Sequence, residues 1–176
     1  MVDDRKPAAT LGQLIGLLNV HEQEVRARAL EALKALTPTA FERFAQRLLH
    51  AYGFEDVKVT RRSRDGGIDG HGHIRVGLTS VSVAFQCKRW LDKPVGRDRV
   101  DAFRGATSGL HEQGYIFTTS RFTPEAIDAQ RRPGAVPIAL FDGERIIEIM
   151  FDRQFGVGFR DLRVPELNID VVLEEG

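Results

Sequence analysis

The apolar residues of the first third of the chain recur at helical spacing. From Leu11 to Leu36 they return every three or four positions, as on one face of a helix. A polar break at residues 19–21 predicts either two helices or one kinked helix. We therefore expect residues 1–36 to form an N-terminal helical extension, either a small module of its own or a clasp on the rest of the chain.

A second amphipathic segment follows at once. Thr37 and Pro38 are residue types that favour a helix N-cap and first position, and Gly53 is a good C-terminal stop. The pattern predicts a helix over about 38–52 with Glu42 away from its apolar stripe. That stripe consists of Phe41, Phe44, Ala45, Leu48, Leu49 and Tyr52.

After residue 53 the apolar period changes from helical to alternating, which is typical of strands. The resulting order of helix, three strands, helix, strand, helix, strand and helix is typical of an α/β sandwich with a mixed sheet. The last two strands each follow a helix, so we expect the strand at 114–119 to run parallel to its neighbour. The strands are expected around 57–59 and over 68–76, 81–88, 114–119 and 136–141, and the helices over 97–110, 124–132 and from 142 onward.

Composition places the chain among ordinary globular proteins. Of its 176 residues 42% are apolar and 28% charged, and no apolar run approaches the ~18 residues of a membrane helix. The first residues lack the pattern of a signal peptide. The single cysteine, Cys87, excludes an intrachain disulfide and a cysteine zinc site, so a reducing cytoplasm is the simplest compartment.

Charge is unevenly distributed although the total is zero. Residues 57–104 carry 11 basic and 5 acidic side chains, whereas both flanking parts are net negative. A basic middle is compatible with a localised site for a polyanion, and equally with a solvated face that is basic by chance.

Two segments carry residues suited to chemistry. On a strand over 81–88, Gln86 and Lys88 share one face, and Cys87 lies on the other, core-facing side. If residues 68–88 form a hairpin, Asp69 reaches the same neighbourhood, and a carboxylate, an amide oxygen and a strand carbonyl then converge as ligands that suit Mg²⁺. The alternative makes Asp65 and Asp69 turn residues and Lys88 a surface charge.

Several ordered motifs together resemble the Mrr-type restriction endonucleases of the PD-(D/E)xK nuclease superfamily. The resemblance covers roughly residues 37–157, leaving 158–176 as a tail with an edge strand expected over 164–173. Its motifs are Phe41-Glu42, Gly53-Phe54, Asp65-Gly66-Gly67-Ile68-Asp69, Gln86-Cys87-Lys88, Gly105-Ala106, the run Thr118-Thr119-Ser120-Arg121-Phe122-Thr123, and Asp142-Gly143-Glu144-Arg145.

The resemblance implies a restriction-endonuclease-like three-layer fold and divalent-metal-dependent hydrolysis of DNA phosphodiesters. By carry-over, Asp69 and Gln86 bind the metal together with the backbone carbonyl of Cys87, and Lys88 is the catalytic lysine. Glu42 matches an acidic residue that assists the metal site; its alternative is a surface helix residue. Gln86 stands where most of the superfamily has an acidic residue, but glutamine is usual in the Mrr group.

Basic residues around this site are the candidates for contacts to double-stranded DNA. Those nearest in sequence are Arg62, Arg64 and Arg89, followed by Arg61, Lys58, Lys93, Arg97 and Arg99. Each of them is alternatively a solvated charge.

The other motifs are weaker. His71 and His73 lack further ligands for a zinc site, and no phosphate-binding loop of an NTPase occurs in this sequence.

The sequence thus predicts a cytoplasmic Mg²⁺-dependent (or Mn²⁺-dependent) DNA endonuclease acting in restriction of foreign or modified DNA. A repair or recombination nuclease, a non-cleaving DNA-binding module and a protein-interaction domain are the alternatives. A homodimer and a separate recognition or motor subunit are compatible partners, and no membrane is expected.

Overall fold

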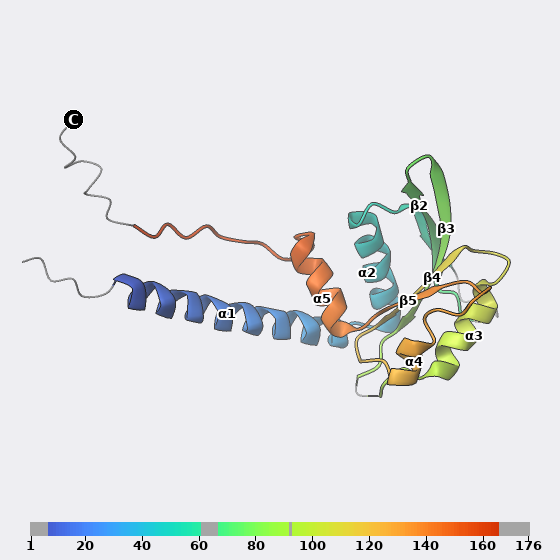
Figure 1. Ribbon diagram of the computed structural model, residues 1–176, viewed down its shortest axis with the longest axis horizontal. Coiled ribbons are helices and arrows are strands. Elements are labelled where there is room, and N and C mark those ends of the chain that lie inside the picture. The colour runs from blue at the N-terminus through green and yellow to red at the C-terminus, as the bar shows by residue number, and fades with distance from the viewer. Residues whose placement is uncertain (1–6, 61–66, 92, 166–176) are drawn as a thin grey trace, which may run out of the picture.

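A computed structural model describes residues 7–60, 67–91 and 93–165 of the chain. Helices and strands alternate within these ranges in the predicted order (Figure 1). The helices are α1 (Pro7–Ala35), α2 (Pro38–Ala51), α3 (Arg97–Thr107), α4 (Pro124–Asp128) and α5 (Gly143–Asp152). The strands are β1 (Glu55–Val59), β2 (Gly70–Val76), β3 (Thr79–Lys88), β4 (Gln113–Thr118) and β5 (Ile138–Phe141).

The strands form a mixed five-stranded sheet in the order β1-β2-β3-β4-β5. β1, β2 and β3 pair antiparallel, and β3, β4 and β5 pair parallel. The predicted hairpin and the parallel β4 are confirmed, because β3 to β4 and β4 to β5 are crossover connections that carry a helix. β3 lies at the centre and pairs on both sides.

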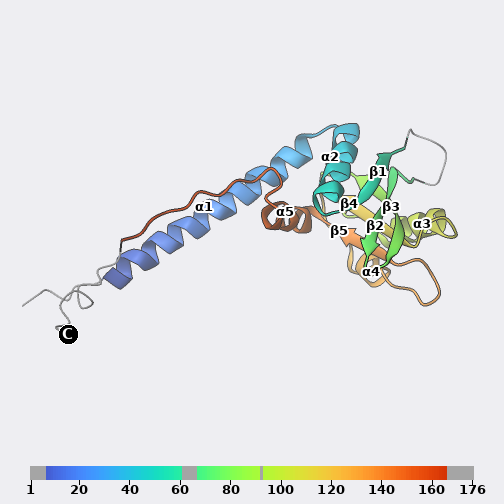
Figure 2. The same cartoon turned by 90° about the horizontal axis from the view of Figure 1, so that it is seen from above.

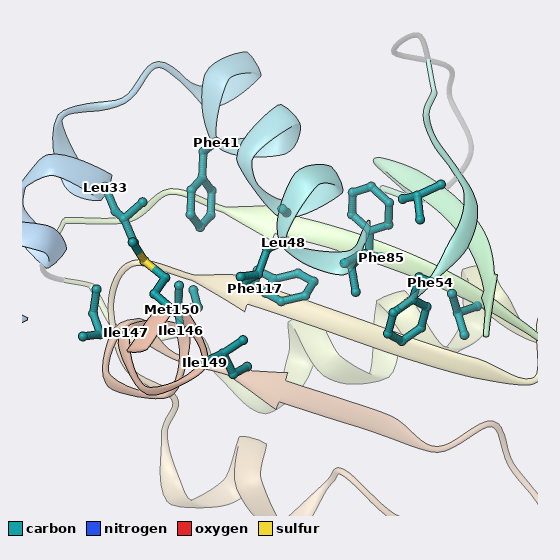
Figure 3. Packing of buried hydrophobic residues seen from close by; sticks show 14 of the residues in the cluster. Leu33, Phe41, Leu48, Phe54, Phe85, Phe117, Ile146, Ile147, Ile149 and Met150 are labelled. Carbon is teal, nitrogen blue, oxygen red and sulfur yellow. The ribbon is translucent and has the colours of Figure 1, made fainter. Parts of the chain in front are cut away.

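Helices cover both faces of the sheet and make three layers (Figures 1 and 2). α2, α5 and the end of α1 pack on one face, where Phe41, Phe85 and Phe117 are buried (Figure 3). α3 and α4 cover the other face, where Ala84 and Phe103 are completely buried. The alternation of β3 sends Phe85 to one layer and Ala84 to the other, as its period of two requires.

Short polar residues start the helices where the sequence predicted. The Thr37 hydroxyl accepts a hydrogen bond from the backbone N–H of Ala40, and Pro38 is the first helical residue. Asp142 accepts from the N–H of Arg145 in the same way. Such caps satisfy N–H groups that have no partner inside the helix.

α1 is one uninterrupted helix, so the predicted break at residues 19–21 is wrong. Its last turns pack against α5, while its first half projects away from the body (Figures 1 and 2). Leu17 and Val20 are accordingly 68% and 58% exposed. Residues 19–21 mark the stretch where the helix leaves the core, which needs no change in backbone conformation. No helix in the described ranges has both the length and the hydropathy needed to cross a membrane.

Two further boundaries differ from the prediction. α4 ends at Asp128 instead of about residue 132, and the guanidinium of Arg104 donates to the carbonyls of Ala129 and Gln130 just after this end. Of the strand predicted over 164–173, the first two residues belong to no strand, and the others lie outside the described residues.

Candidate active site

Asp69 directly precedes β2, at the open end of the hairpin of β2 and β3. The backbone N–H of Asp69 donates to the Phe85 carbonyl at 2.9 Å, and its own carbonyl accepts from Thr60 at 2.9 Å. Its carboxylate reaches further along β3 and accepts from the backbone N–H of Cys87 at 2.7 Å. The Asp69 carboxylate therefore lies against β3 at the residue between Gln86 and Lys88.

Gln86 is held in the opening of the hairpin. Its side chain is 4% exposed, and its amide nitrogen donates to the carbonyl of Gly67. Gly67 has a φ of 94°, and a Cβ there would lie 2.1 Å from the Gln86 amide nitrogen. Position 67 thus needs glycine for its backbone conformation and for the approach of the amide.

The pKa of the Cys87 thiol reflects the charges around it. Burial raises the pKa of this thiol well above its ordinary value, and the negative charges of Asp69 and then Glu42 raise the pKa further. The positive charge of Lys88 lowers the pKa. Glu42 from α2, Asp69 from the hairpin and Lys88 from β3 thus all act on one point of the structure. Such a thiol is protonated and poorly nucleophilic, in keeping with a packing role.

α2 is fixed to the sheet beside this point. Phe41 and Ala45 of α2 are completely buried on either side of Glu42. The side-chain amide of Gln46, one turn after Glu42, donates to the Val57 carbonyl at 2.7 Å. These contacts explain how a helix residue approaches the end of β3.

Two hydroxyls to which no sequence motif assigned a role hold the end of β3. Thr118 donates to the carbonyl of Lys88 at 2.7 Å, and Thr119 donates to the carbonyl of Trp90 at 2.8 Å. The available signal was a pair of polar residues that ends an otherwise apolar strand.

The predicted metal ligands are the Asp69 and Glu42 carboxylates, the Gln86 amide and the Cys87 carbonyl. Within the described ranges, no three His, Cys, Asp or Glu side chains are grouped so as to hold a metal ion. A set of two carboxylates, an amide and a carbonyl suits a hard cation that keeps part of its water. It does not suit a zinc site, which needs nitrogen or sulfur ligands.

The predicted DNA-binding residues differ in their surroundings. Arg89 donates through Nη1 to the carbonyl of Lys34 in the last turn of α1, at 3.0 Å. Lys58 and Lys93 are exposed, and Arg97 pairs with Asp101 at the surface. Arg61, Arg62 and Arg64, also predicted to bind DNA, lie outside the described residues, as does Asp65.

His111, to which no sequence motif assigned a role, lies beside the His71–His73 motif. The rings of His71 and His111 stack with centroids 6.1 Å apart, and Nδ1 of His111 is hydrogen-bonded to the Ser82 hydroxyl at 2.9 Å. Burial lowers the pKa of His111, and the neighbouring His71 and His73 lower it further. These contacts join the loop before β4 to the hairpin.

Comparisons with known proteins place the chain in a family. The restriction endonuclease family of the Mrr catalytic domain matches residues 33–150. The type IV methyl-directed restriction enzyme EcoKMrr of Escherichia coli (strain K12) is 39% identical over an alignment of 153 residues, and the match covers 83% of this chain and 48% of that enzyme. The chain thus spans about half the length of this curated relative.

Two solved structures share the fold. The DNA modification-dependent restriction endonuclease AspBHI superposes with a TM-score of 0.60 and 24% identity, over 75% of this chain and 36% of that one. The MspJI restriction endonuclease in complex with a 27-mer oligonucleotide gives a TM-score of 0.57 and 25% identity, over 71% and 31% of the two chains. The predicted fold class is confirmed.

Proposed function

Because the chain belongs to the restriction endonuclease family of the Mrr catalytic domain, we propose that it is a divalent-metal-dependent endonuclease that hydrolyses DNA phosphodiester bonds. The observation that carries this proposal is the Asp69 carboxylate, which accepts a hydrogen bond from the N–H of Cys87, between Gln86 and Lys88 on β3. This arrangement brings oxygen ligands and an ammonium group to the end of one strand.

The side chains divide the work by their chemistry. Asp69, Gln86, Glu42 and the Cys87 carbonyl would hold Mg²⁺, or Mn²⁺ in its place. A bound divalent ion supplies positive charge that stabilises the phosphate and activates water. The ammonium of Lys88 stabilises the charge that develops on the phosphate as water attacks in line with the leaving oxygen.

The substrate we propose is double-stranded DNA that carries modified bases. The similar proteins are described as methyl-directed and modification-dependent, and MspJI was solved with an oligonucleotide. Contacts from the candidate residues Arg62, Arg64 and Arg89 to phosphates make binding salt-sensitive. The proposal includes a homodimer, because two strands need two cuts. It also includes a separate recognition or motor subunit, because recognition needs further protein surface. The proposed location is the cytoplasm.

The decisive experiment is cleavage of methylated and unmethylated plasmid by the purified chain with Mg²⁺ or Mn²⁺. The wild type is compared with Lys88→Ala and with Arg75→Ala as a matched control. Arg75 is a cation on β2 whose side chain is 71% exposed. We expect metal-dependent cleavage by the wild type and by Arg75→Ala, and none by Lys88→Ala.

Equal inertness of the wild type and Lys88→Ala on every DNA and with both metals would overturn the endonuclease proposal. Salt-sensitive DNA binding without cleavage would then identify a non-cleaving DNA-binding module. Preference for methylated plasmid supports restriction of modified DNA over a repair or recombination role.

A further inference from the structure

The chain turns sharply directly after Lys88. The carbonyl of Lys88 accepts two hydrogen bonds, from the backbone N–H of Trp90 at 2.8 Å and from the Thr118 hydroxyl at 2.7 Å. Lys88 and Thr118 are the last paired residues of the β3–β4 ladder. The peptide group that follows Lys88 is therefore fixed by a turn on one side and by a side chain on the other.

The Thr118 hydroxyl both donates and accepts a hydrogen bond. Besides donating to Lys88 it accepts from the backbone N–H of Ser120 at 3.2 Å, which fixes the direction of its proton. Thr118 has no exposed surface, and a buried hydroxyl is unfavourable unless it is hydrogen-bonded. Valine has the same shape and needs no hydrogen bond at this position. The threonine hydroxyl therefore adds the hydrogen bond to the Lys88 carbonyl.

The neighbouring chain repeats this pattern. Thr119, 2% exposed, donates its hydroxyl to the carbonyl of Trp90 at 2.8 Å. Further on, the N–H of Val95 donates to the Arg121 carbonyl, and the Val95 carbonyl accepts from Thr123. Residues 118–123 thus hold the segment that leaves β3 at Lys88, Trp90 and Val95.

We infer that Thr118 is a positioning residue for Lys88. On the β2 side the Asp69 carboxylate holds the N–H of Cys87, and on the β4 side the Thr118 hydroxyl holds the carbonyl of Lys88. Together the two contacts set the direction in which the Lys88 side chain leaves the strand. The inference rests on the proposed function, because it assigns Thr118 to the same phosphodiester hydrolysis.

The test compares Thr118→Val, which removes only the hydroxyl, with Thr118→Ser, which keeps it. Thr107→Val is the matched control, because Thr107 is equally buried and its hydroxyl also donates to backbone carbonyls, here inside α3. The measurements are kcat and KM on one cleavable DNA, and the melting temperature of each variant.

We expect Thr118→Val to lower kcat by about tenfold to a hundredfold, with KM for DNA near the wild-type value. Thr118→Ser restores most of the rate. Thr107→Val lowers the melting temperature as Thr118→Val does but cleaves at the wild-type rate. If Thr118→Val does not fold, Thr118→Cys replaces it, since a thiol is only a weak donor.

A wild-type kcat in Thr118→Val, or a loss of kcat in Thr107→Val as large as that in Thr118→Val, overturns the positioning role and leaves the endonuclease proposal intact. A failure of Thr118→Ser to recover the rate also overturns it. A wild-type chain that cleaves no DNA overturns the endonuclease proposal, and the inference with it.

Discussion

Single residues at the opening of the hairpin show how little tolerance the site has. Gly67 combines a positive φ with close contact to Gln86, whereas Gly53 has a similar φ of 99° and no atom within 4 Å of its missing Cβ. Alanine substitutions at the two positions therefore distinguish the effect of backbone strain from the effect of displacing the Gln86 amide.

Gly67→Ala is expected to abolish or strongly reduce DNA cleavage, because the new methyl group displaces Gln86. Gly53→Ala carries comparable backbone strain of about 1 kcal/mol or more but leaves the site in place. Urea unfolding and a cleavage assay of both variants make the measurement. Equal cleavage by the two variants would contradict the role given to Gly67.

His111 predicts a dependence of stability on pH. Because burial and the neighbouring histidines lower its pKa in the folded protein, the unfolded chain takes up a proton first as the pH falls. The contribution of neutral His111 is therefore complete above its ordinary pKa of 6.5 and declines below it until the folded pKa is passed.

Urea unfolding between pH 8 and pH 5 measures this decline, and His111→Gln is expected to make it shallower. The same slope in the wild type and in His111→Gln would show that other groups cause the dependence.

At the scale of elements, Arg104 decides how α3 meets the chain between α4 and β5. Its guanidinium, 7% exposed, pairs with Asp101 at 2.7 Å and donates to the carbonyls of Ala129, Gln130 and Val136. This single side chain satisfies carbonyls that α4 leaves unpaired where it ends.

Arg104→Ala is expected to lower the free energy of unfolding by about 3 kcal/mol or more, since it leaves buried carbonyls without donors. Arg75→Ala, which removes an exposed ion pair at 3.6 Å, should cost less than about 1 kcal/mol. Chemical denaturation of the two variants provides the comparison, and losses of similar size would contradict the assignment.

At the scale of the whole molecule, the C-terminal half of α1 packs against the body. Leu33, 5% exposed, packs beside Met150 and Ile147 of α5 (Figure 3). Arg89 adds a hydrogen bond from the end of β3 to the carbonyl of Lys34. The C-terminal end of α1 thus belongs to the core, and its first half does not.

Leu33→Ala is expected to destabilise the protein by about 2–5 kcal/mol, the usual cost of such a cavity. Leu17→Ala, on the projecting half, should change stability by no more than about 0.5 kcal/mol. Thermal or urea unfolding distinguishes the two. Near-neutral behaviour of Leu33→Ala would show that α1 is not part of the cooperative core.

The sequence by itself determined the order of the helices and strands, the caps at Thr37 and Asp142 and the two faces of β3, whereas spacing left open whether Asp69 joins the end of β3 or is a turn residue. These features depend on residues a few positions apart, or on one hairpin, and local periodicity reports both. The resemblance to the Mrr group supplied the roles of Glu42 and Gln86, which spacing alone left open.

Only the tertiary structure decided what lies between distant segments. The Thr118 hydroxyl on Lys88, the Arg89 contact to α1 and the stacking of His111 on His71 join residues 30 to 55 positions apart. The continuous α1 and the short α4 were decided in the same way, by what the body does or does not contact. Local patterns carry no record of such partners, because the partners are brought together by the packing of the whole sheet.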